Sequence, residues 1–284
     1  MNDNKNQTLK GTLYLVTTPI GNLSDITYRA VKVLSEVDFV AAEDTRNSAK
    51  LLHYLQINKE LVSYHEHNKK SKGEEIVARL QSGESCALIT DAGTPAISDP
   101  GEDLVKLCAT NNVPVTAAPG VSAAITALTL SGLDTRYFVF EGFLPVVKSE
   151  RNKRLEIIKN EKRTVILYEA PHKLKKTLED LFDALGNRKI SLCRELTKLN
   201  EEIMRTTLSD AILYYTEAAP RGEYVLVLEG NKETAKNDVF WSEMSILEHV
   251  EFYIANGMDK KDAIKSAAKD RNVPKNIIYN EYVK

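Results

Sequence analysis

Short apolar runs alternate with helix-like segments through most of this chain, and the alternation restricts the fold more than any other feature of its 284 residues. Alternating strands and helices favour a parallel or mixed sheet flanked by helices. The apolar runs that predict strands are 13–17, 37–42, 61–65, 86–90, 114–118, 137–143, 164–168, 190–196 and 224–228. They are too many for one small sheet, so the sequence predicts two α/β domains that meet near Pro119.

The limits of the domains follow from where this alternation begins and ends. We expect a disordered N-terminus at 1–10, an N-terminal α/β domain at 11–119 and a second α/β domain at 120–230. The polar stretch 231–239 predicts a linker. From 240 to 284 the apolar residues recur only at helical spacing, which indicates a small helical domain. Its last helices fit a helix-turn-helix that contacts nucleic acid and a plain three-helix packing unit equally well.

Composition argues against several classes of protein. The formal net charge of −2 gives no indication of a polyanionic partner, so any contact with nucleic acid must come from local patches. The three cysteines form no CxxC pair and no Cys/His cluster, which argues against a disulfide framework or a zinc site. No apolar run approaches the roughly 20 residues that cross a bilayer, and the polar start has no signal-peptide core. We therefore expect a cytoplasmic protein with buried, reduced thiols, no metal and no membrane contact.

A loop at 91–101, rich in Gly, Pro, Asp, Ser and Thr, follows the apolar run 86–90. In an open α/β sheet, ligands bind outside the carboxyl ends of the strands, so this is a candidate ligand loop. Three more loops at strand ends, 17–22, 119–123 and 168–172, share its small residues. The dinucleotide fingerprint, the P-loop, GxSxG and HExxH are all missing from the sequence. The loops suit an adenosine-sized polar ligand without a phosphate chain, although turn residues are also common in plain connections.

Two polar clusters, 43–46 and 65–68, follow the second and third predicted strands. Strand ends on one edge of a parallel sheet lie close together, so a carboxylate and a histidine from these clusters could accept a proton from a hydroxyl nucleophile. The alternative is that Glu43 and Asp44 cap a helix while Arg46 pairs with them at the surface. Metal binding by His65 and His67 is disfavoured, because an i, i+2 pair on a loop is poor ligand spacing.

Basic residues are concentrated between 145 and 176, a segment that contains ten Lys and Arg but only four Glu. A segment of this kind suits a surface that contacts phosphates, with an affinity that falls as salt rises. A solvated helix face has the same composition, and the sequence does not separate the two alternatives.

The loops and clusters together resemble one family. Seven motifs occur in the order found in the ribosomal RNA small subunit methyltransferase I family, which lies within the tetrapyrrole methylase-like superfamily. They are residues 15–25, 42–46, 91–101, 118–123, 168–172, 194–198 and 220–223. The resemblance covers about 11–230, and the tail after Asp238 is similar to that family's small helical C-terminal domain.

The resemblance implies a bilobal tetrapyrrole methylase-like fold, with S-adenosylmethionine (SAM) in a cleft between two α/β domains. It also implies a homodimer that methylates the 2′-hydroxyl of a decoding-centre cytidine, at position 1402 of 16S rRNA in the 30S subunit. By motif position, the residues expected to bind SAM are Pro19, Gly21, Asp91, Ala92, Gly93, Thr94, Ile97, Ser122, Ala123, Tyr168, Pro220, Gly222 and Glu223.

On the substrate side, we expect Asp44, His65 or Glu66 to accept the proton and Arg46 and Asn68 to hold the nucleotide. Glu169 is a second-rank candidate.

One departure from the superfamily concerns a carboxylate in the 91–101 loop. Relatives often have Gly-Asp-Pro where this chain has Gly93-Thr94-Pro95, so Asp91 or Asp99 would have to supply the carboxylate instead. Two other functions stay open: a porphyrinoid C-methyltransferase and a non-enzymatic RNA-binding factor. The basic segment and the helical tail favour RNA, because a porphyrinoid enzyme needs neither.

Overall fold

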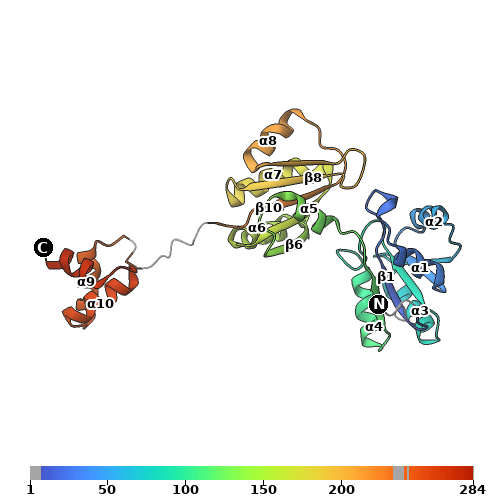
Figure 1. Ribbon diagram of the computed structural model, residues 1–284, viewed down its shortest axis with the longest axis horizontal. Helices are drawn as coiled ribbons and strands as arrows, with labels where there is room; N and C mark the ends of the chain where they lie inside the picture. Colours follow the sequence, from blue (N-terminus) through green and yellow to red (C-terminus); the bar gives the residue numbers. More distant parts are fainter. Residues whose placement is uncertain (1–7, 233–239, 242, 284) are drawn as a thin grey trace. The chain divides into compact units, whose positions relative to one another are not determined.

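The computed structural model describes residues 8–232, 240–241 and 243–283, which form two compact units, 1–230 and 231–284. Figure 1 labels many of their helices and strands. Most of the expected disordered N-terminus, and most of the expected linker at 231–239, lie outside the described residues. Within the N-terminal stretch, the Thr8 hydroxyl donates a hydrogen bond to Glu36 and the Leu9 amide donates one to the Tyr14 hydroxyl.

The first sheet is parallel throughout, with strand order β3-β2-β4-β1-β5. Its strands are β1 (Leu13–Val16), β2 (Phe39–Ala42), β3 (Glu60–Ser63), β4 (Cys86–Ile89) and β5 (Val115–Ala118). Every residue of β2 and β4 is buried, as expected of strands covered on both faces. Because β1 pairs with both β4 and β5, the loops that follow these three strands leave the sheet side by side.

Helices cover both faces of this sheet. They are α1 (Tyr28–Glu36), α2 (Thr45–Tyr54), α3 (Lys69–Gln81) and α4 (Gly101–Thr110). Ala30 and Leu34 of α1 and Leu52 of α2 belong to the core on one face. Ile76 of α3 and Leu104 of α4 belong to the core on the other face.

The second sheet is mixed, with strand order β6-β7-β10-β8-β9 and a parallel β6–β7 pair beside three antiparallel pairs. Its strands are β6 (Phe138–Phe143), β7 (Thr164–Glu169), β8 (Lys189–Arg194), β9 (Glu202–Thr207) and β10 (Tyr224–Leu228). Helix α5 (Ala123–Ser131) packs on one face. Helices α6 (Lys148–Asn160), α7 (Pro171–Leu185) and α8 (Leu208–Glu217) pack on the other.

Two elements differ from the sequence predictions. Strand β9 was not predicted, because four of its six residues are polar and the strand lies only half-buried at the edge of the sheet, so it forms no sustained apolar run. Ser24 and Asp25 are residue types that favour helix caps, so the sequence predicts the start of the first helix there, but both lie in the 3-10 helix Leu23–Asp25. Thr27 is the N-cap of α1, and its hydroxyl accepts a hydrogen bond from the Ala30 amide at 3.1 Å.

The unit at 231–284 contains α9 (Ile246–Ala255), α10 (Lys260–Asp270) and α11 (Lys275–Val283). Val250, Ile264 and Ile278 are among the side chains of its separate core. Asp259, a residue type that favours helix caps, is the N-cap of α10.

The three cysteines, Cys86, Cys108 and Cys193, are buried and unpaired. Among the described residues, no helix has the length and apolar character that crossing a membrane requires.

The position of Leu226 in the middle of β10 makes a test of the second core. Leu226 is fully buried, and truncating such a leucine leaves a cavity that costs about 2–5 kcal/mol. We expect Leu226→Ala to lower the unfolding free energy, measured by urea denaturation, by that amount. Leu213→Ala on α8, where the side chain is 69% exposed, is the matched control and should change it by less than about 0.5 kcal/mol.

Candidate functional site

Backbone hydrogen bonds join the loop after β1 to the loop after β4. The Thr18 amide donates to the Gly93 carbonyl at 2.9 Å, and the Gly93 amide donates back to Thr18 at 3.1 Å. The Thr18 hydroxyl also donates to the Thr90 carbonyl at 3.2 Å. Gly93 has φ +82°, a left-handed conformation that glycine adopts at little cost. Two stretches more than seventy residues apart in sequence are thus fixed to each other.

The loop after β5 joins the same group. The Thr94 hydroxyl donates to the Val121 carbonyl at 3.3 Å, and the Thr17 and Thr94 hydroxyl oxygens lie 3.5 Å apart. A Cβ on Gly120 would lie 3.0 Å from Thr17, so a residue without a side chain permits this approach. We call the three segments 17–22, 91–101 and 119–123 the carboxyl-edge loops. Pro19, Gly93, Thr94, Ser122 and Ala123, all predicted to bind the cofactor, lie on them.

Asp99 holds the 91–101 loop in shape. Its Oδ1 accepts hydrogen bonds from the Ala96 amide at 3.0 Å and the Gly101 amide at 2.7 Å. Ala96 and Ser98 have φ of +66° and +60°, which non-glycine residues rarely adopt, so the loop stores backbone strain. Asp91 and Asp99 are the two carboxylates that could replace the superfamily's Asp. Of these, Asp99 is already hydrogen-bonded to the backbone of its own loop.

Side chains from the second sheet meet these loops. Ile20, Ala123 and Tyr168 all pack against the buried cluster that includes Ala124 and Val225. A Cβ on Gly142 of β6 would lie 3.0 Å from the Ser98 hydroxyl oxygen, which places the 91–101 loop against that strand. Burial raises the pKa of Tyr168, so its hydroxyl stays protonated and can donate a hydrogen bond.

A second group of predicted residues meets around Lys198. The Lys198 ammonium lies 3.0 Å from Glu195 Oε1 and 2.9 Å from Glu223 Oε2. Its aliphatic chain occupies the place where a Cβ on Gly21 would lie. Gly222, with φ +74°, leaves room for Glu195 in the same way, and the Glu223 amide donates to Glu195 Oε1 at 3.0 Å. Gly21, Gly222 and Glu223 are therefore brought together.

Among the described residues, the other predicted cofactor residues lie on or near the carboxyl-edge loops without side-chain hydrogen bonds that fix their place in the site. Asp91, Ala92 and Ile97 are exposed on the 91–101 loop, and Pro220 is half-buried ahead of β10. For the part of the chain that the structure describes, no hydrogen bond joins these side chains to another loop. Ser122 uses its hydroxyl to cap α5 through the Ile125 amide.

Asp44 and Arg46 form the helix cap and surface pair that the sequence left as an alternative. The Asp44 carboxylate accepts hydrogen bonds from the Arg46 amide at 2.9 Å and from its guanidinium at 3.0 and 3.2 Å. The guanidinium lowers the pKa of Asp44 to about 2. A carboxylate of such low basicity, held by its own neighbour, is a weak proton acceptor.

The His65 cluster is a turn that Asn68 holds closed. Asn68 Oδ1 accepts a hydrogen bond from the His65 amide at 2.8 Å, and its amide group donates to the Ser63 carbonyl at 3.1 Å. Glu66 pairs with Lys69 at 2.8 Å. The buried Nδ1 of His65 has no hydrogen-bond partner among the described residues. Within the same part of the structure, no hydrogen bond or ion pair connects this turn to Asp44 or Arg46.

Glu43, next to Asp44, is the residue that sequence reasoning did not select. Its half-buried carboxylate accepts a hydrogen bond from the Thr90 hydroxyl at 3.3 Å, at the carboxyl ends of β2 and β4. Burial and the nearby charges of Asp91 and Asp99 raise the pKa of Glu43, while His65 opposes the shift. Glu169, the second-rank candidate, is buried at the end of β7, where it accepts a hydrogen bond from Thr177.

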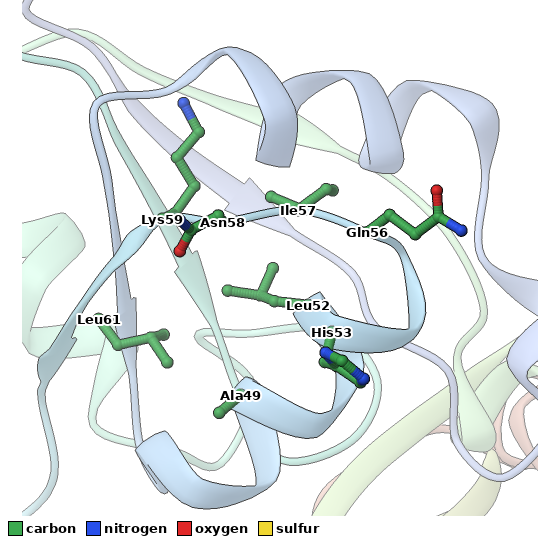
Figure 2. Close-up of a pocket in the computed structure, with 8 residues that line it drawn as sticks. All are labelled: Ala49, Leu52, His53, Gln56, Ile57, Asn58, Lys59 and Leu61. Atoms are coloured by element: carbon green, nitrogen blue, oxygen red, sulfur yellow. The ribbon is translucent and has the colours of Figure 1, made fainter.

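A surface pocket beside α2 and β3 belongs to another part of the molecule. It is lined by Ala49, Leu52, His53, Gln56, Ile57, Asn58, Lys59 and Leu61, which Figure 2 shows around the turn from α2 into the strand. Because this turn enters the amino end of β3, the pocket is at the opposite end of the parallel strands from the carboxyl-edge loops. It therefore takes no part in the site. Within the described ranges, no three His, Cys, Asp or Glu residues are grouped as a metal site requires.

Glu43 makes a test of the electrostatics of the site. Its raised pKa means that the folded protein binds the Glu43 proton more tightly than the unfolded chain, so the ionised carboxylate destabilises the fold at neutral pH. We expect Glu43→Gln to raise the unfolding free energy at pH 7, and the gain to shrink as the pH falls through the raised pKa towards the ordinary value of 4.5. Urea denaturation at pH 7 and pH 4 measures both.

The matched control for this variant is Glu75→Gln on α3, where a surface glutamate pairs with Lys72. It removes the same charge without the burial and should give no such gain. A loss of stability in Glu43→Gln at pH 7 would contradict the assignment.

Comparisons with known proteins agree with this arrangement. Residues 12–212 match the family model of tetrapyrrole (corrin/porphyrin) methylases. Solved structures of the same fold include a diphthine synthase, with a TM-score of 0.60 at 13% identity over 77% of this chain and 89% of that one. A uroporphyrin-III C-methyltransferase from Thermus thermophilus gives 0.56 at 19% identity, over 77% of this chain and 94% of its own. At these identities the likeness concerns the fold alone.

Curated sequences give a closer match, and all three described here are named ribosomal RNA small subunit methyltransferase I. The chain is 52% identical to the one from Halalkalibacterium halodurans, over 96% of this chain and 95% of the relative. Identity is 49% with Bacillus subtilis (96% and 94%) and 46% with Synechocystis (95% and 96%). Because these matches span nearly the whole of both chains, this protein belongs to the ribosomal RNA small subunit methyltransferase I family, within the tetrapyrrole methylases.

Proposed function

We propose that this protein uses SAM to methylate the ribose 2′-hydroxyl of a decoding-centre cytidine in 16S rRNA, acting on the 30S subunit. The names of its relatives support the RNA substrate, and the resemblance found in the sequence supports the 2′-oxygen and the cytidine. The observation that carries the proposal is the hydrogen-bonded group of carboxyl-edge loops, centred on Thr18 and Gly93. In this proposal the protein works in the cytoplasm as a homodimer and without a metal.

The carboxyl-edge loops fit the chemistry of SAM. Their small residues and backbone amides suit adenosine and an amino-acid chain, and the loops carry no glycine-rich phosphate cradle. Gly93 and Gly120 stand where a side chain would crowd Ile20 and Thr17 of the loop after β1. The residues that would hold the cofactor are those of the three loops, with Tyr168 and the Gly21–Gly222–Glu223 group beside them. When bound, SAM supplies a methyl group that its positively charged sulfur has already activated.

The part left to the protein is positioning and removal of one proton. Rigid loops that hold the reacting groups in line reduce the entropy lost on the way to the transition state. The hydroxyl proton needs an acceptor at the same edge of the sheet, and the ion pair with Arg46 makes Asp44 a poor one. We assign this role to Glu43 and His65, which follow β2 and β3. The two side chains are near enough for the charge of one to act on the other. Arg46, with its side chain 87% exposed, is left to contact the RNA backbone.

The direct test uses SAM labelled with tritium in the methyl group. We expect the wild-type protein to transfer label to 30S subunits, and nuclease digestion of the product to yield 2′-O-methylcytidine. Naked 16S rRNA and uroporphyrinogen are the comparison substrates. Label that appears only in the tetrapyrrole would contradict the proposal, and so would RNA binding without any transfer.

Gly222 provides a test of the cofactor loops with a matched control. Gly222 and Gly186 both have φ +74°, a value that L-residues rarely adopt, so alanine brings backbone strain at both positions. A Cβ on Gly222 would lie 2.5 Å from Glu195, whereas one on Gly186 meets no described atom within 4 Å. We expect Gly222→Ala to weaken SAM binding, measured by calorimetry, by about tenfold or more, since a 1 Å displacement in a site is costly. Gly186→Ala should leave SAM affinity unchanged.

A further inference from the structure

Phe143, the last residue of β6, keeps a large apolar ring in solvent beside the carboxyl-edge loops. Its side chain is 57% exposed, although β6 belongs to a sheet with a well-filled core. Gly142, the residue before it, lies against Ser98 of the 91–101 loop. An exposed aromatic ring at a rigid strand end next to a candidate active site offers a flat apolar face to a ligand.

A β-bulge in β6 decides where this ring points. Phe140 pairs with Ile166 of β7, but the next register partners are Gly142 with Leu167 and Phe143 with Tyr168. Glu141 is therefore an extra residue in the strand. In a regular strand, residues three apart point to opposite faces, whereas this bulge returns Phe143 to the face of Phe140.

The bulge is secured by its own contacts. The buried Glu141 carboxylate accepts a charge-assisted hydrogen bond from Arg154 of α6. Gly142 has φ +65° and no space for a side chain against Ser98, so few other residues could stand there. The orientation of Phe143 is thus fixed from both sides of the strand.

Two aromatic rings of β6, Phe140 and Phe143, make edge-to-face contacts with Tyr168. The Phe140 and Phe143 ring centroids lie 5.0 and 5.7 Å from that of Tyr168, both in T-shaped geometry. Phe140 is covered by the cluster beneath α5, while Phe143 stays open. A ring that is immobilised at one edge and exposed elsewhere pays little entropy on stacking with another flat ring.

A positive charge follows five residues after Phe143, at the start of α6. Lys148, the first residue of α6, is exposed and has no ion pair among the residues placed in the structure. By contrast, Arg151 and Arg154 of the same helix are paired with Asp180 and Glu141. Val147 supplies no side-chain cap to the amino end of α6, so its first amides are also free of a capping side chain. An aromatic ring followed by a free cation matches a nucleobase and its phosphate.

We propose that Phe143 is a stacking platform for an unpaired base of the RNA substrate, and that Lys148 contacts a neighbouring phosphate. The inference rests on the proposed function and adds the recognition of the substrate base. Sequence-specific RNA recognition mostly targets single-stranded segments, and their unstacked bases commonly stack on aromatic side chains. The open ring beside the carboxyl-edge loops offers that surface.

Fluorescence tests the stacking without any methyl donor. The chain has one tryptophan, Trp241, in the other unit, so Phe143→Trp adds a reporter at the proposed platform. The probe is a single-stranded cytidine-containing heptamer with the decoding-centre sequence, compared with the same heptamer carrying an abasic central position. We expect the heptamer to quench the added fluorescence and the abasic form to leave it unchanged. Equal quenching by both, or quenching by neither, would overturn the proposal.

Affinity for 30S subunits tests the energetic part. Base–aromatic stacking has a strength equivalent to roughly 5- to 150-fold in affinity. We expect Phe143→Ala to weaken 30S binding within that range, and Phe143→Tyr to retain it within about threefold. Tyr137→Ala is the matched control, because Tyr137 is 66% exposed just before the opposite end of β6. Lys148→Glu should weaken 30S binding most at low salt.

The outcomes separate this inference from the proposed function. The stacking role would be overturned if Phe143→Ala bound 30S subunits as tightly as the wild-type protein does. It would also be overturned if sedimentation showed that Phe143→Ala changes the oligomeric state, because the ring would then contact a second copy of the chain. If the wild-type protein labels 30S subunits while Phe143→Ala behaves normally, only the stacking inference fails. If wild-type protein transfers no label, the proposed function fails, whatever the fluorescence shows.

Discussion

The arrangement of the site depends on the central place of β1 in a parallel sheet. Because β1 is hydrogen-bonded to both β4 and β5, the loops beyond these strands start a few ångströms apart. The paired amides of Thr18 and Gly93 then join two of these loops, and the Thr94 hydroxyl reaches the third. A ligand at this edge therefore meets segments from three distant parts of the chain, all held by one sheet.

The same edge contains features that lower the stability of the fold. Glu43 is half-buried with Asp91 and Asp99 near it, Ala96 and Ser98 have strained backbones, and His65 has a buried nitrogen without a described partner. Each of these costs free energy that the two sheets must offset. Strain and unbalanced charge of this kind concentrate where proteins bind and react. Their coincidence with the carboxyl-edge loops supports the assignment of the site independently of the comparisons.

Much of the fold could be predicted, because buried strands such as β4 carry an unbroken apolar signal, and the meeting of the loops follows from parallel strand ends. Strand β9 could not, since an edge strand in which only Ile203 and Met204 are apolar has no such signal. The sequence also cannot distinguish the roles of two adjacent carboxylates. Glu43 and Asp44 look equivalent in the sequence, and only the fold turns one towards Thr90 and the other towards Arg46. Nor does the sequence reveal the bulge that reorients Phe143.

The burial of the three cysteines has a practical consequence. Burial raises the pKa of each thiol, to about 11 for Cys108, and so suppresses the thiolate that reacts with alkylating and oxidising reagents. We therefore expect the native protein to react with such reagents as if it had no cysteine. A single cysteine introduced on the surface would then be the one reactive thiol of the described fold. No other cysteine would then have to be replaced before a cleavage reagent or a spin label is attached at a chosen surface position.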